Sequence, residues 1–406
     1  MNNFIISNNV IKSKSMKVII IGAGASGIVA AINYKRNHLD DEILIIEHLE
    51  KPLKKILATG NGKCNLGNSN IDFKNFNNEK FARLILENYN YENLFESISI
   101  KTKLIDSLAY PVSESAVSVR EALLNEINKL KIQINCNEKL VDYSSNEKIT
   151  VKTNKNTYIA DKLILAGGLC SSPKLGTDGS LLNILKSHNY KIKEVNPGLS
   201  PLYTKEKTKI LDGIRCKCNV TLKTTKVIHE EKGEVLFKDH GLSGIVIFNT
   251  MSIIARNLSK QYKIYIDLLP DFSMEYLEDY CKNHSFSEFL LAFINPKISN
   301  YLLTRFKTND LILKSIKQLE FNFDKPYGFD FSQVSVGGVS IDEVDNNLMS
   351  RKERNVYLKK GTDSIMLETY TEMLYDPQIK IVSDRSKFVK SLNAYLSYLD
   401  GILYVY

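Results

Sequence analysis

Residues 17–47 read KVIIIGAGASGIVAAINYKRNHLDDEILIIE. An apolar segment runs into a glycine-rich turn, and a second apolar segment ends on Glu47. The pattern predicts a βαβ unit, with a strand over 17–21, a helix from about Ala25 and a second strand before Glu47. Such a unit is the core of dinucleotide-binding folds, so we expect an α/β chain with a Rossmann-like domain.

The three glycines of the turn have separate roles in this interpretation. Gly22 lets the chain turn tightly, Gly24 leaves room for a pyrophosphate beside the backbone, and Gly27 lets the helix pack closely against the strand. The N–H groups at the start of the helix, those of Ala25 and Ser26, would then bind the phosphates. Glycine spacing alone is weak evidence, but here a strand precedes it and a helix follows.

Glu47 stands 20 residues after Gly27, at the end of the second predicted strand. A carboxylate there can accept hydrogen bonds from both ribose hydroxyls and would repel a 2′-phosphate. The alternative is a secretory signal, because residues 18–32 are mostly apolar and follow lysines. The glycines interrupt that run and an acid-terminated strand follows it, which favours the nucleotide fold.

The chain has 406 residues, 43% hydrophobic and 25% charged, enough for two or three domains with a full-sized core. No apolar run reaches the 18 or so residues of a membrane helix. The six cysteines show no C-x-x-C or C-x-x-H spacing, so neither a metal site nor a disulfide framework is predicted. Reduced thiols and the absence of a recognisable targeting signal predict a cytoplasmic protein.

The net charge is +8, from 54 basic and 46 acidic residues, and the lysines are scattered along the chain. Nucleic-acid binding is therefore compatible with the sequence but not indicated by it. No membrane partner is predicted, and the sequence does not predict an oligomeric state.

Two further glycine-rich segments are candidate ligand loops. In the loop over 51–68, N–H groups around Gly60 and Gly62 and the nearby lysines 54, 55 and 63 would suit the phosphates or ring edge of a cofactor; the alternative is a solvated turn. Short strand-like runs over 131–166 end at Gly167 and Gly168, and a strand that runs into glycines is expected where a sheet meets its ligand. Between these loops we expect a helical region over 76–97 and a helix capped by Ser113 that ends near Leu130.

The chain divides into four parts by its pattern. Residues 1–15 are expected to be a disordered extension, and 16–197 the first part of the nucleotide-binding domain. Residues 198–325 form an insert: a β-rich half, 198–270, with strand-like runs over 209–268 and a turn at Lys232-Gly233, and a helical half within 271–318. Residues 326–406 return to the first domain.

Six ordered blocks of sequence resemble the BaiN/YhiN-like flavoproteins, also called the aminoacetone-oxidase family of FAD-binding enzymes. The blocks are GAGASG at 22–27, TGNGKCNLGN at 59–68, YPVSESAVSV at 110–119, LAGGLCSSPKLGTDG at 165–179, GEVLFKDHGLSG at 233–244 and VGGVSIDEVDNNLMS at 336–350. The resemblance implies a two-dinucleotide-binding FAD domain with an inserted β-barrel-like part and a helical part. It extends from about Met16 to Tyr357.

The resemblance also implies an FAD site, residue by residue. It puts the diphosphate on Gly22, Gly24, Ala25, Ser26 and Gly27, the ribose on Glu47, the adenine beside Leu140, and the pyrophosphate side of the site by Gly167 and Gly168. Further along the cofactor it puts Lys55, Asn61, Gly62, Lys63, Cys64 and Asn65. Cys64 could be a redox thiol or a positioning residue, and the absence of a resolving cysteine nearby in sequence favours positioning. No catalytic residue is assigned; His240 is the one histidine that falls in a matched block.

The sequence departs from the family pattern at Lys63, at Gly67, which replaces a threonine, at Ser107 and Leu108, which replace a Gly-Arg pair, and after Tyr357. Lys63 replaces an arginine, which keeps the charge but loses the planar fork. After Tyr357, from about residue 358, the family's flavin-contacting Gly-Glu and Gly-Gly-Tyr-Asn-Leu pattern is missing.

The expected function is that of an FAD-dependent oxidoreductase that transfers hydride through flavin N5 to or from a small molecule, with NAD(P)H as a possible donor. One alternative is a catalytically impaired nucleotide-binding relic. Another, which rests only on the basic charge, is a flavoprotein acting on tRNA.

Overall fold

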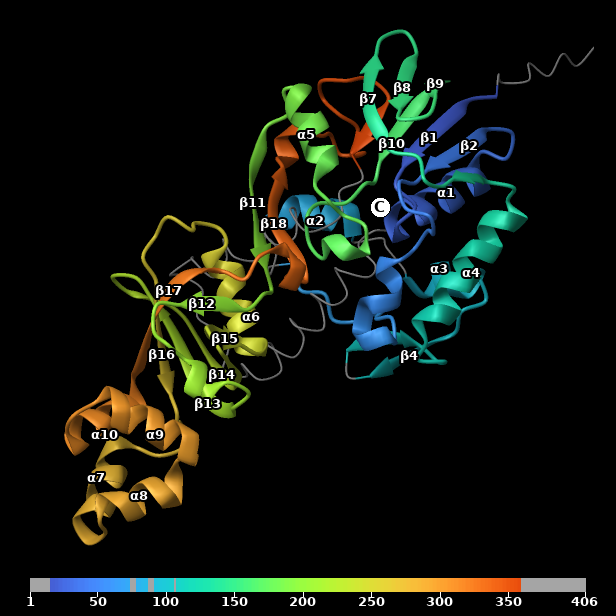
Figure 1. Ribbon diagram of the computed structural model, residues 1–406. Coiled ribbons are helices and arrows are strands. Elements are labelled where there is room, and N and C mark those ends of the chain that lie inside the picture. Colours follow the sequence, from blue (N-terminus) through green and yellow to red (C-terminus); the bar gives the residue numbers. More distant parts are fainter. Residues whose placement is uncertain (1–14, 74–77, 87–90, 106, 359–406) are drawn as a thin grey trace, which may run out of the picture.

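The computed structural model describes residues 15–73, 78–86, 91–105 and 107–358 (Figure 1). The expected N-terminal extension, apart from Ser15, and the atypical segment after Leu358 lie outside the described residues.

A five-stranded parallel sheet forms the centre of the upper domain in Figure 1, in the order β19-β10-β1-β2-β6. Its strands are β1 (Lys17–Ile21), β2 (Glu42–Ile46), β6 (Gln133–Asn135), β10 (Lys162–Leu165) and β19 (Val356–Leu358). Helix α1 (Ala25–Asn37) connects β1 to β2, which pair in parallel with Ile21 opposite Ile46. The predicted βαβ unit and the Rossmann-like α/β fold are thus confirmed.

Both faces of this sheet are buried, because successive side chains of a strand point to opposite sides. Val18 and Ile20 face a core that contains α1, whereas Ile19 and Ile21 face a second core. Helix α4 (Ala116–Lys129) packs on α1, where the Arg36 guanidinium lies 2.7 Å from the Glu126 carboxylate. The other face is covered by the antiparallel sheet β7 (Leu140–Ser145), β8 (Ile149–Thr153) and β9 (Thr157–Ala160), and by α5 (Ser180–Ser187).

Helix α4 begins two residues later than expected. Ser115, not Ser113, is its N-cap, because the Ser115 hydroxyl accepts the N–H of Ser118. A small antiparallel sheet of three strands precedes this helix in the sequence, in the spatial order β3-β5-β4. Its strands are β3 (Gly67–Asn68), β4 (Thr102–Ile105) and β5 (Leu108–Pro111). Helices α2 (Glu79–Leu86) and α3 (Tyr91–Ser97) lie in the region expected to be helical.

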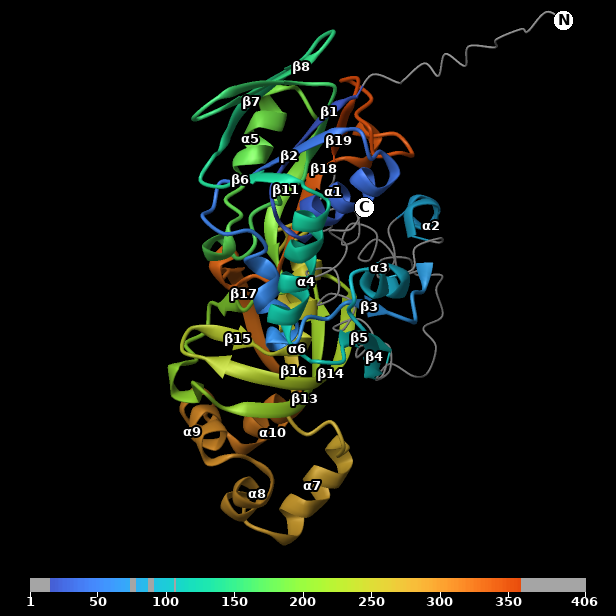
Figure 2. The ribbon, with the colours of Figure 1, turned by 90° about the vertical axis from the view of Figure 1, so that its right-hand side faces the viewer.

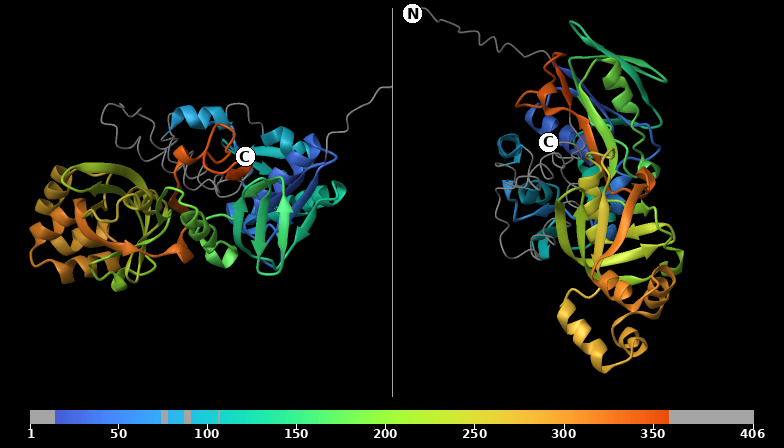
Figure 3. Two further views of the ribbon diagram at one scale, coloured as in Figure 1. Left: turned by 90° about the horizontal axis from the view of Figure 1, so that it is seen from above. Right: turned by 90° about the vertical axis from the view of Figure 1, so that its left-hand side faces the viewer.

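Two antiparallel strands connect the upper domain to a closed six-stranded barrel, which the view from above in Figure 3 shows beside the sheet. The connecting strands are β11 (Ile192–Gly198) and β18 (Val334–Val339), with Pro197 opposite Ser335. Around the barrel the strands are β12 (Leu202–Thr204), β15 (Gly241–Ser243), β14 (Val227–Lys238), β13 (Arg215–Lys223), β16 (Lys263–Asp267) and β17 (Leu319–Pro326).

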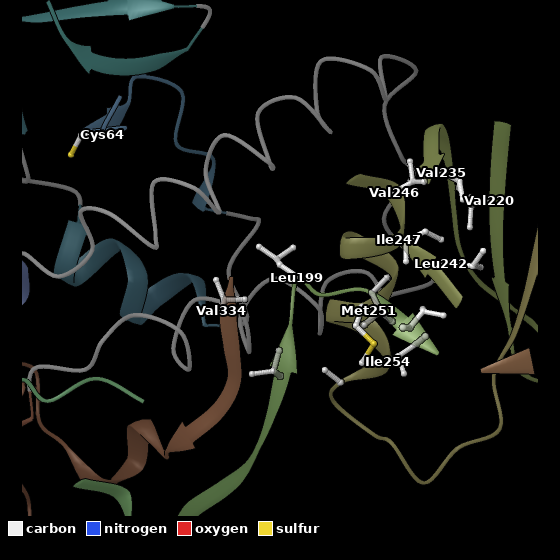
Figure 4. Close-up of a cluster of buried hydrophobic side chains, with 14 of the residues drawn as sticks. Cys64, Leu199, Val220, Val235, Leu242, Val246, Ile247, Met251, Ile254 and Val334 are labelled. Atoms are coloured by element: carbon white, nitrogen blue, oxygen red, sulfur yellow. The ribbon is translucent and has the colours of Figure 1, made fainter. Parts of the chain in front are cut away.

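The β-rich half of the insert differs from its expected pattern in two places. Residues 245–254, expected as strand, form the buried helix α6 (Ile245–Ile254), whose Val246, Ile247 and Met251 pack toward the barrel in Figure 4. The expected turn at Lys232-Gly233 lies inside β14 instead. There Gly233 is needed for space, because a Cβ on it would lie 2.5 Å from a methyl group of Val246.

Four helices form a lobe at the far end of the barrel (Figure 2). They are α7 (Met274–Asn283), α8 (Phe286–Phe293), α9 (Pro296–Arg305) and α10 (Asn309–Lys317), within the range expected to be helical. Ser273, Ser285, Asn295 and Thr308 cap their first turns through side-chain oxygens, as the sequence of each helix start favours. No helix in the described part of the chain is long and apolar enough to span a membrane.

Candidate functional site: a cleft at the carboxyl ends of the parallel strands

A cleft of about 910 Å³, a volume that includes open solvent at its mouth, lies where β1, β2 and β10 end. Ile21 and Ile46 form part of its floor together with Ala166. Its walls come from the start of α1, the segment after β2, the segment before β7, and the loop between β10 and α5. Ligands of open parallel sheets bind at this edge, because the loops that follow the strands converge there.

The three glycines before and within α1 each occupy a different environment. Gly22 has a φ of +101°, and a Cβ on it would lie 2.4 Å from the Ala166 carbonyl oxygen. A Cβ on Gly27 would lie 1.9 Å from the Gly22 carbonyl oxygen, so helix and strand approach closely there. A Cβ on Gly24 would meet no atom within 4 Å and would project into open space.

The start of α1 offers unpaired donors to the cleft. The first hydrogen bond of the helix joins the N–H of Ile28 to the Gly24 carbonyl at 3.0 Å, so the N–H groups of Ala25, Ser26 and Gly27 have no acceptor among the described residues. No side chain caps this end of the helix. Ser26 is fully buried, and its hydroxyl likewise has no hydrogen-bond partner within the described ranges. This end of the helix suits an anion.

Glu47 is buried against the same turn. Its Oε2 accepts the Ala23 N–H at 2.7 Å, and its Oε1 accepts the Leu49 N–H at 2.8 Å. The imidazole of His48 lies 3.0 Å from Oε1 through Nδ1. Burial alone would raise the pKa of Glu47, but the hydrogen bonds from His48, Leu49 and Ala23 together lower it. The carboxylate is therefore ionised at neutral pH, and it lines the cleft at the carboxyl end of β2.

Lysines line the wall after β2. Lys51, Lys54 and Lys55 all contribute to the cleft, and Lys55 reaches the Ser171 hydroxyl at 3.4 Å. Lys54 donates to the Lys174 carbonyl at 2.7 Å and so joins this wall to the loop opposite. Together with the start of α1, these cations make the cleft attractive to a diphosphate.

The opposite wall contains Gly167, Gly168 and Leu140. Gly168 has a φ of +72°, and a Cβ on it would lie 2.5 Å from the Thr177 methyl group. The loop also closes against the segment after β2, because a Cβ on Gly176 would lie 2.4 Å from a methyl group of Leu49. These close approaches explain Gly168 and Gly176 of the LAGGLCSSPKLGTDG block as positions against which neighbouring side chains pack closely.

The structure brings together only part of the predicted residue set. Gly22, Gly24, Ala25, Glu47, Lys55, Leu140, Gly167 and Gly168 line the cleft, whereas Ser26 and Gly27 lie behind its wall in α1. Asn61, Gly62, Lys63, Cys64 and Asn65 do not line it. They belong to or follow a turn with left-handed backbone at Gly60, Asn61 and Gly62, within the 3₁₀ segment η1 (Lys55–Gly62).

Cys64 is buried, and burial raises the pKa of its thiol to about 11, while a hydrogen bond with Thr59 acts the other way. The thiol is therefore protonated at neutral pH, which makes it a poor nucleophile. In Figure 4 it lies apart from α6 and the barrel. His240, the histidine of the matched blocks, is on the barrel, 68% exposed and 3.2 Å from Asp239.

Several charged or titratable residues of the cleft were not predicted from the sequence, among them His48, Lys139 and Asp178. Lys139, before β7, lies 2.7 Å from Asp178, which precedes α5, and this ion pair joins two walls of the cleft. Pairs formed between segments so far apart in sequence leave no spacing pattern. The position of His48 next to Glu47 was the one available signal.

The residues present fit an adenine dinucleotide. An open glycine at a helix start, paired with a buried carboxylate at the next strand end, is the donor and acceptor set that a diphosphate and a ribose need.

Comparison with known proteins finds one family model and several relatives that match this chain. The family model for the HI0933-like protein Rossmann domain matches residues 16–360. The 3-dehydro-bile acid delta(4,6)-reductase of Clostridium scindens is 32% identical over 84% of this chain and 91% of its own length. The ribosomal RNA dihydrouridine synthase of Escherichia coli is 23% identical over 84% of this chain and 89% of its own.

Among solved structures, a ferredoxin-flavin thioredoxin reductase from Clostridium acetobutylicum matches 39% of each chain, with 21% identity and a TM-score of 0.23. A bacillithiol disulfide reductase from Staphylococcus aureus matches 38% of this chain and 39% of its own, with 20% identity and the same TM-score of 0.23.

Proposed function

The chain belongs to the HI0933-like Rossmann family and is an FAD-dependent oxidoreductase, and we propose that it reduces a carbon–carbon double bond conjugated with a carbonyl group, using NAD(P)H. The observation that carries the cofactor part is the open Gly24 at the start of α1, with the ionised Glu47 beside it in the cleft. In this proposal the α1 N–H groups and Lys55 hold the diphosphate, Glu47 holds the ribose, and Leu140 contacts the adenine.

The substrate class rests on the names of two relatives. One describes the reduction of a 3-dehydro-bile acid with double bonds at positions 4 and 6, and the other the formation of dihydrouridine, a pyrimidine with a saturated bond beside a carbonyl. These substrates share little besides a double bond conjugated with a carbonyl. A bound flavin supplies hydride from N5 to the far carbon of such a bond, and the protein supplies orientation and a proton donor. No residue is assigned as that donor.

The proposal also puts five residues beside the flavin end of the cofactor: Asn61, Gly62, Lys63, Cys64 and Asn65. Cys64 fits a positioning role, because its thiol is buried and protonated. The relic alternative is not favoured by the family membership, and its basis, the segment after Leu358, lies outside the described residues. A cytoplasmic location, suggested by six cysteines that form no disulfide in the described part of the chain, is also part of this proposal.

Anaerobic flavin spectroscopy tests the proposed reaction. The FAD-loaded protein should lose its absorbance near 450 nm when NADH or NADPH is added, and a comparison of the two rates identifies the donor. Conjugated enones should then restore the absorbance, whereas the matched saturated ketones should not. A reduced flavin that dioxygen reoxidises but no enone does would contradict the proposed substrate class.

A second candidate is an RNA substrate, which the Escherichia coli relative and the net charge of +8 favour. It predicts a dihydrouridine deficit in the RNA of a strain that lacks the protein, restored by the intact gene. An unchanged dihydrouridine content would exclude this candidate and leave a small molecule as the substrate.

A further inference from the structure

The Glu47 carboxylate is nearly saturated with hydrogen-bond donors from its own chain. A carboxylate offers about four lone-pair sites. Oε1 is occupied twice, by the Leu49 N–H at 2.8 Å and by His48 Nδ1 at 3.0 Å, and Oε2 once, by the Ala23 N–H at 2.7 Å. One site remains, on Oε2.

The adenosine ribose of a dinucleotide presents two adjacent hydroxyls to such a carboxylate. One remaining site cannot accept both. The N–H groups of Ala23 and Leu49 are fixed by the backbone of two turns, whereas the His48 imidazole is on a side chain that can rotate away. Its side chain is 32% exposed, so it has solvent to move into. Of the three donors, His48 is the one that can leave.

His48 is held by charge as well as by geometry. Its hydrogen bond to Glu47 raises the pKa of the imidazole, burial acts against this, and the charges of Glu47 and Asp178 raise it further while Lys139 lowers it. These are the charged groups that face His48 from the end of β2, from the loop before α5 and from the segment before β7. A neutral imidazole can still donate from Nδ1, but without the charge its bond to a carboxylate is weaker.

We propose that His48 competes with the adenosine ribose of the cofactor for Oε1 of Glu47, so that cofactor binding displaces His48 and releases its proton to solvent. This inference rests on the proposed function, because it takes the cleft to be the FAD site. It makes His48 a positioning residue that sets the pH dependence of cofactor affinity.

The direction in which cofactor affinity changes with pH follows from the coupling between cofactor binding and proton binding at His48. In the free protein Glu47 keeps His48 protonated to a higher pH, and displacement returns the imidazole toward its ordinary pKa of about 6.5. Cofactor affinity should therefore rise as the pH increases from about 6.5 through the raised pKa, and level off above it. Below about 6.5 the imidazole is protonated in both states, so the affinity should be low and independent of pH.

The test is a titration of the FAD-free protein with FAD, and separately with ADP, from about pH 6 to about pH 9, with proton release measured by calorimetry in two buffers of different ionisation enthalpy. His48→Phe removes the donor and keeps a ring, and His48→Asn serves as a second variant with a neutral donor. His38→Phe is the matched control, because the His38 ring contacts the Tyr34 ring, with 4.4 Å between the ring centroids, and does not line the cleft.

The wild type should bind FAD and ADP several-fold more tightly at the high end of this range and should release a proton on binding. His48→Phe should lose that dependence and bind more tightly than the wild type at low pH, an outcome that a merely structural His48 would not give. A flat wild-type profile with intact FAD binding, or a slope that survives in both His48 variants, would overturn the inference alone. No FAD binding at any pH would overturn the proposed function and the inference with it.

Discussion

At the scale of single residues, the cleft is defined by the glycines at the start of α1 and by Glu47, whose carboxylate accepts a hydrogen bond from Ala23 in the same turn. The sequence predicted that a tight turn at Gly22 and a closely packed helix at Gly27 leave no room for a side chain, and the structure has both close approaches. The phosphate role of Gly24 stays a prediction. It did not predict Lys139 or Asp178, because an ion pair between distant segments forms only after the chain has folded. Reasoning from spacing therefore finds the backbone part of such a site more readily than its side-chain pairs.

Glu47→Ala should weaken FAD binding by about 1–3 kcal/mol, because charge-assisted hydrogen bonds to the ribose are lost. Calorimetric titration of the FAD-free protein measures the change. Glu50→Ala is the matched control, an exposed acid three residues away that does not line the cleft. Equal affinities for the wild type and Glu47→Ala would remove Glu47 from the cofactor site.

Two alanine substitutions in the same turn should separate binding from stability. Gly24→Ala puts a methyl group into open space at the cleft, so the unfolding temperature should stay unchanged while FAD affinity falls. Gly27→Ala forces a methyl group to 1.9 Å from the Gly22 carbonyl oxygen and should destabilise the fold by about 1–3 kcal/mol or more. Thermal unfolding without cofactor, followed by FAD titration, distinguishes the two. Similar losses of stability in both variants would contradict the assigned roles.

At the scale of elements, the pattern identified the strands of the sheet better than the helix of the barrel. β1 and β2 are bounded by a glycine turn and an acid, which fixes their ends. The sequence of α6, IVIFNTMSII, is mostly apolar and rich in β-branched residues, and a short run of this kind does not reveal whether it is a buried strand or a buried helix. Its position against β14 settles the matter through packing, which lies outside any local pattern.

One network of side chains ties α5 to the turn before β19. His188 stacks on Tyr143 at 4.1 Å and lies 2.7 Å from Glu353 and 2.9 Å from Asp142. Burial lowers the pKa of His188, but the hydrogen bonds with Asp142 and Glu353 outweigh it and raise the pKa. Glu353 also accepts the Tyr190 hydroxyl at 2.7 Å.

His188→Phe should therefore cost most stability at low pH. A raised pKa in the folded state stabilises the fold fully below the ordinary value of about 6.5, and this contribution disappears as the pH rises through the raised pKa. The difference in unfolding temperature between wild type and variant should be larger at about pH 6 than at about pH 8.5. His284→Phe serves as the control, because His284 contacts the Tyr280 ring and carbonyl, not a carboxylate pair. A difference that is the same at both pH values would show that stacking alone explains His188.

At the scale of the whole molecule, the chain leaves the Rossmann-like domain and returns to it along paired strands. β11 and β18 lie antiparallel, and the Gln333 N–H donates to the Leu199 carbonyl at 3.2 Å. The change of pattern near Pro197 and the return near Phe329 thus meet in space. The lobe of four helices lies at the end of the barrel (Figure 2). The chain enters this lobe after β16 and returns to the barrel at β17, and Ile266 of β16 pairs with Leu319 of β17.

This arrangement predicts that the helical lobe can be removed without loss of the cofactor site. Every described residue that lines the cleft comes from positions 21–184, and none from the lobe. Replacing residues 268–317 by an Asn-Gly turn would join β16 to β17 as a hairpin. The unfolding temperature should fall, because Tyr301 and Arg305 no longer cover Phe321 and the ion pair of Lys317 with Asp267 is lost. FAD stoichiometry and affinity, measured by absorbance and titration, should stay at the level of the full chain, and Glu47→Ala should weaken binding in the shortened chain as it does in the full one. A shortened chain that keeps its barrel, as judged by resistance to proteolysis, yet no longer binds FAD would show that the lobe contributes to the cofactor site.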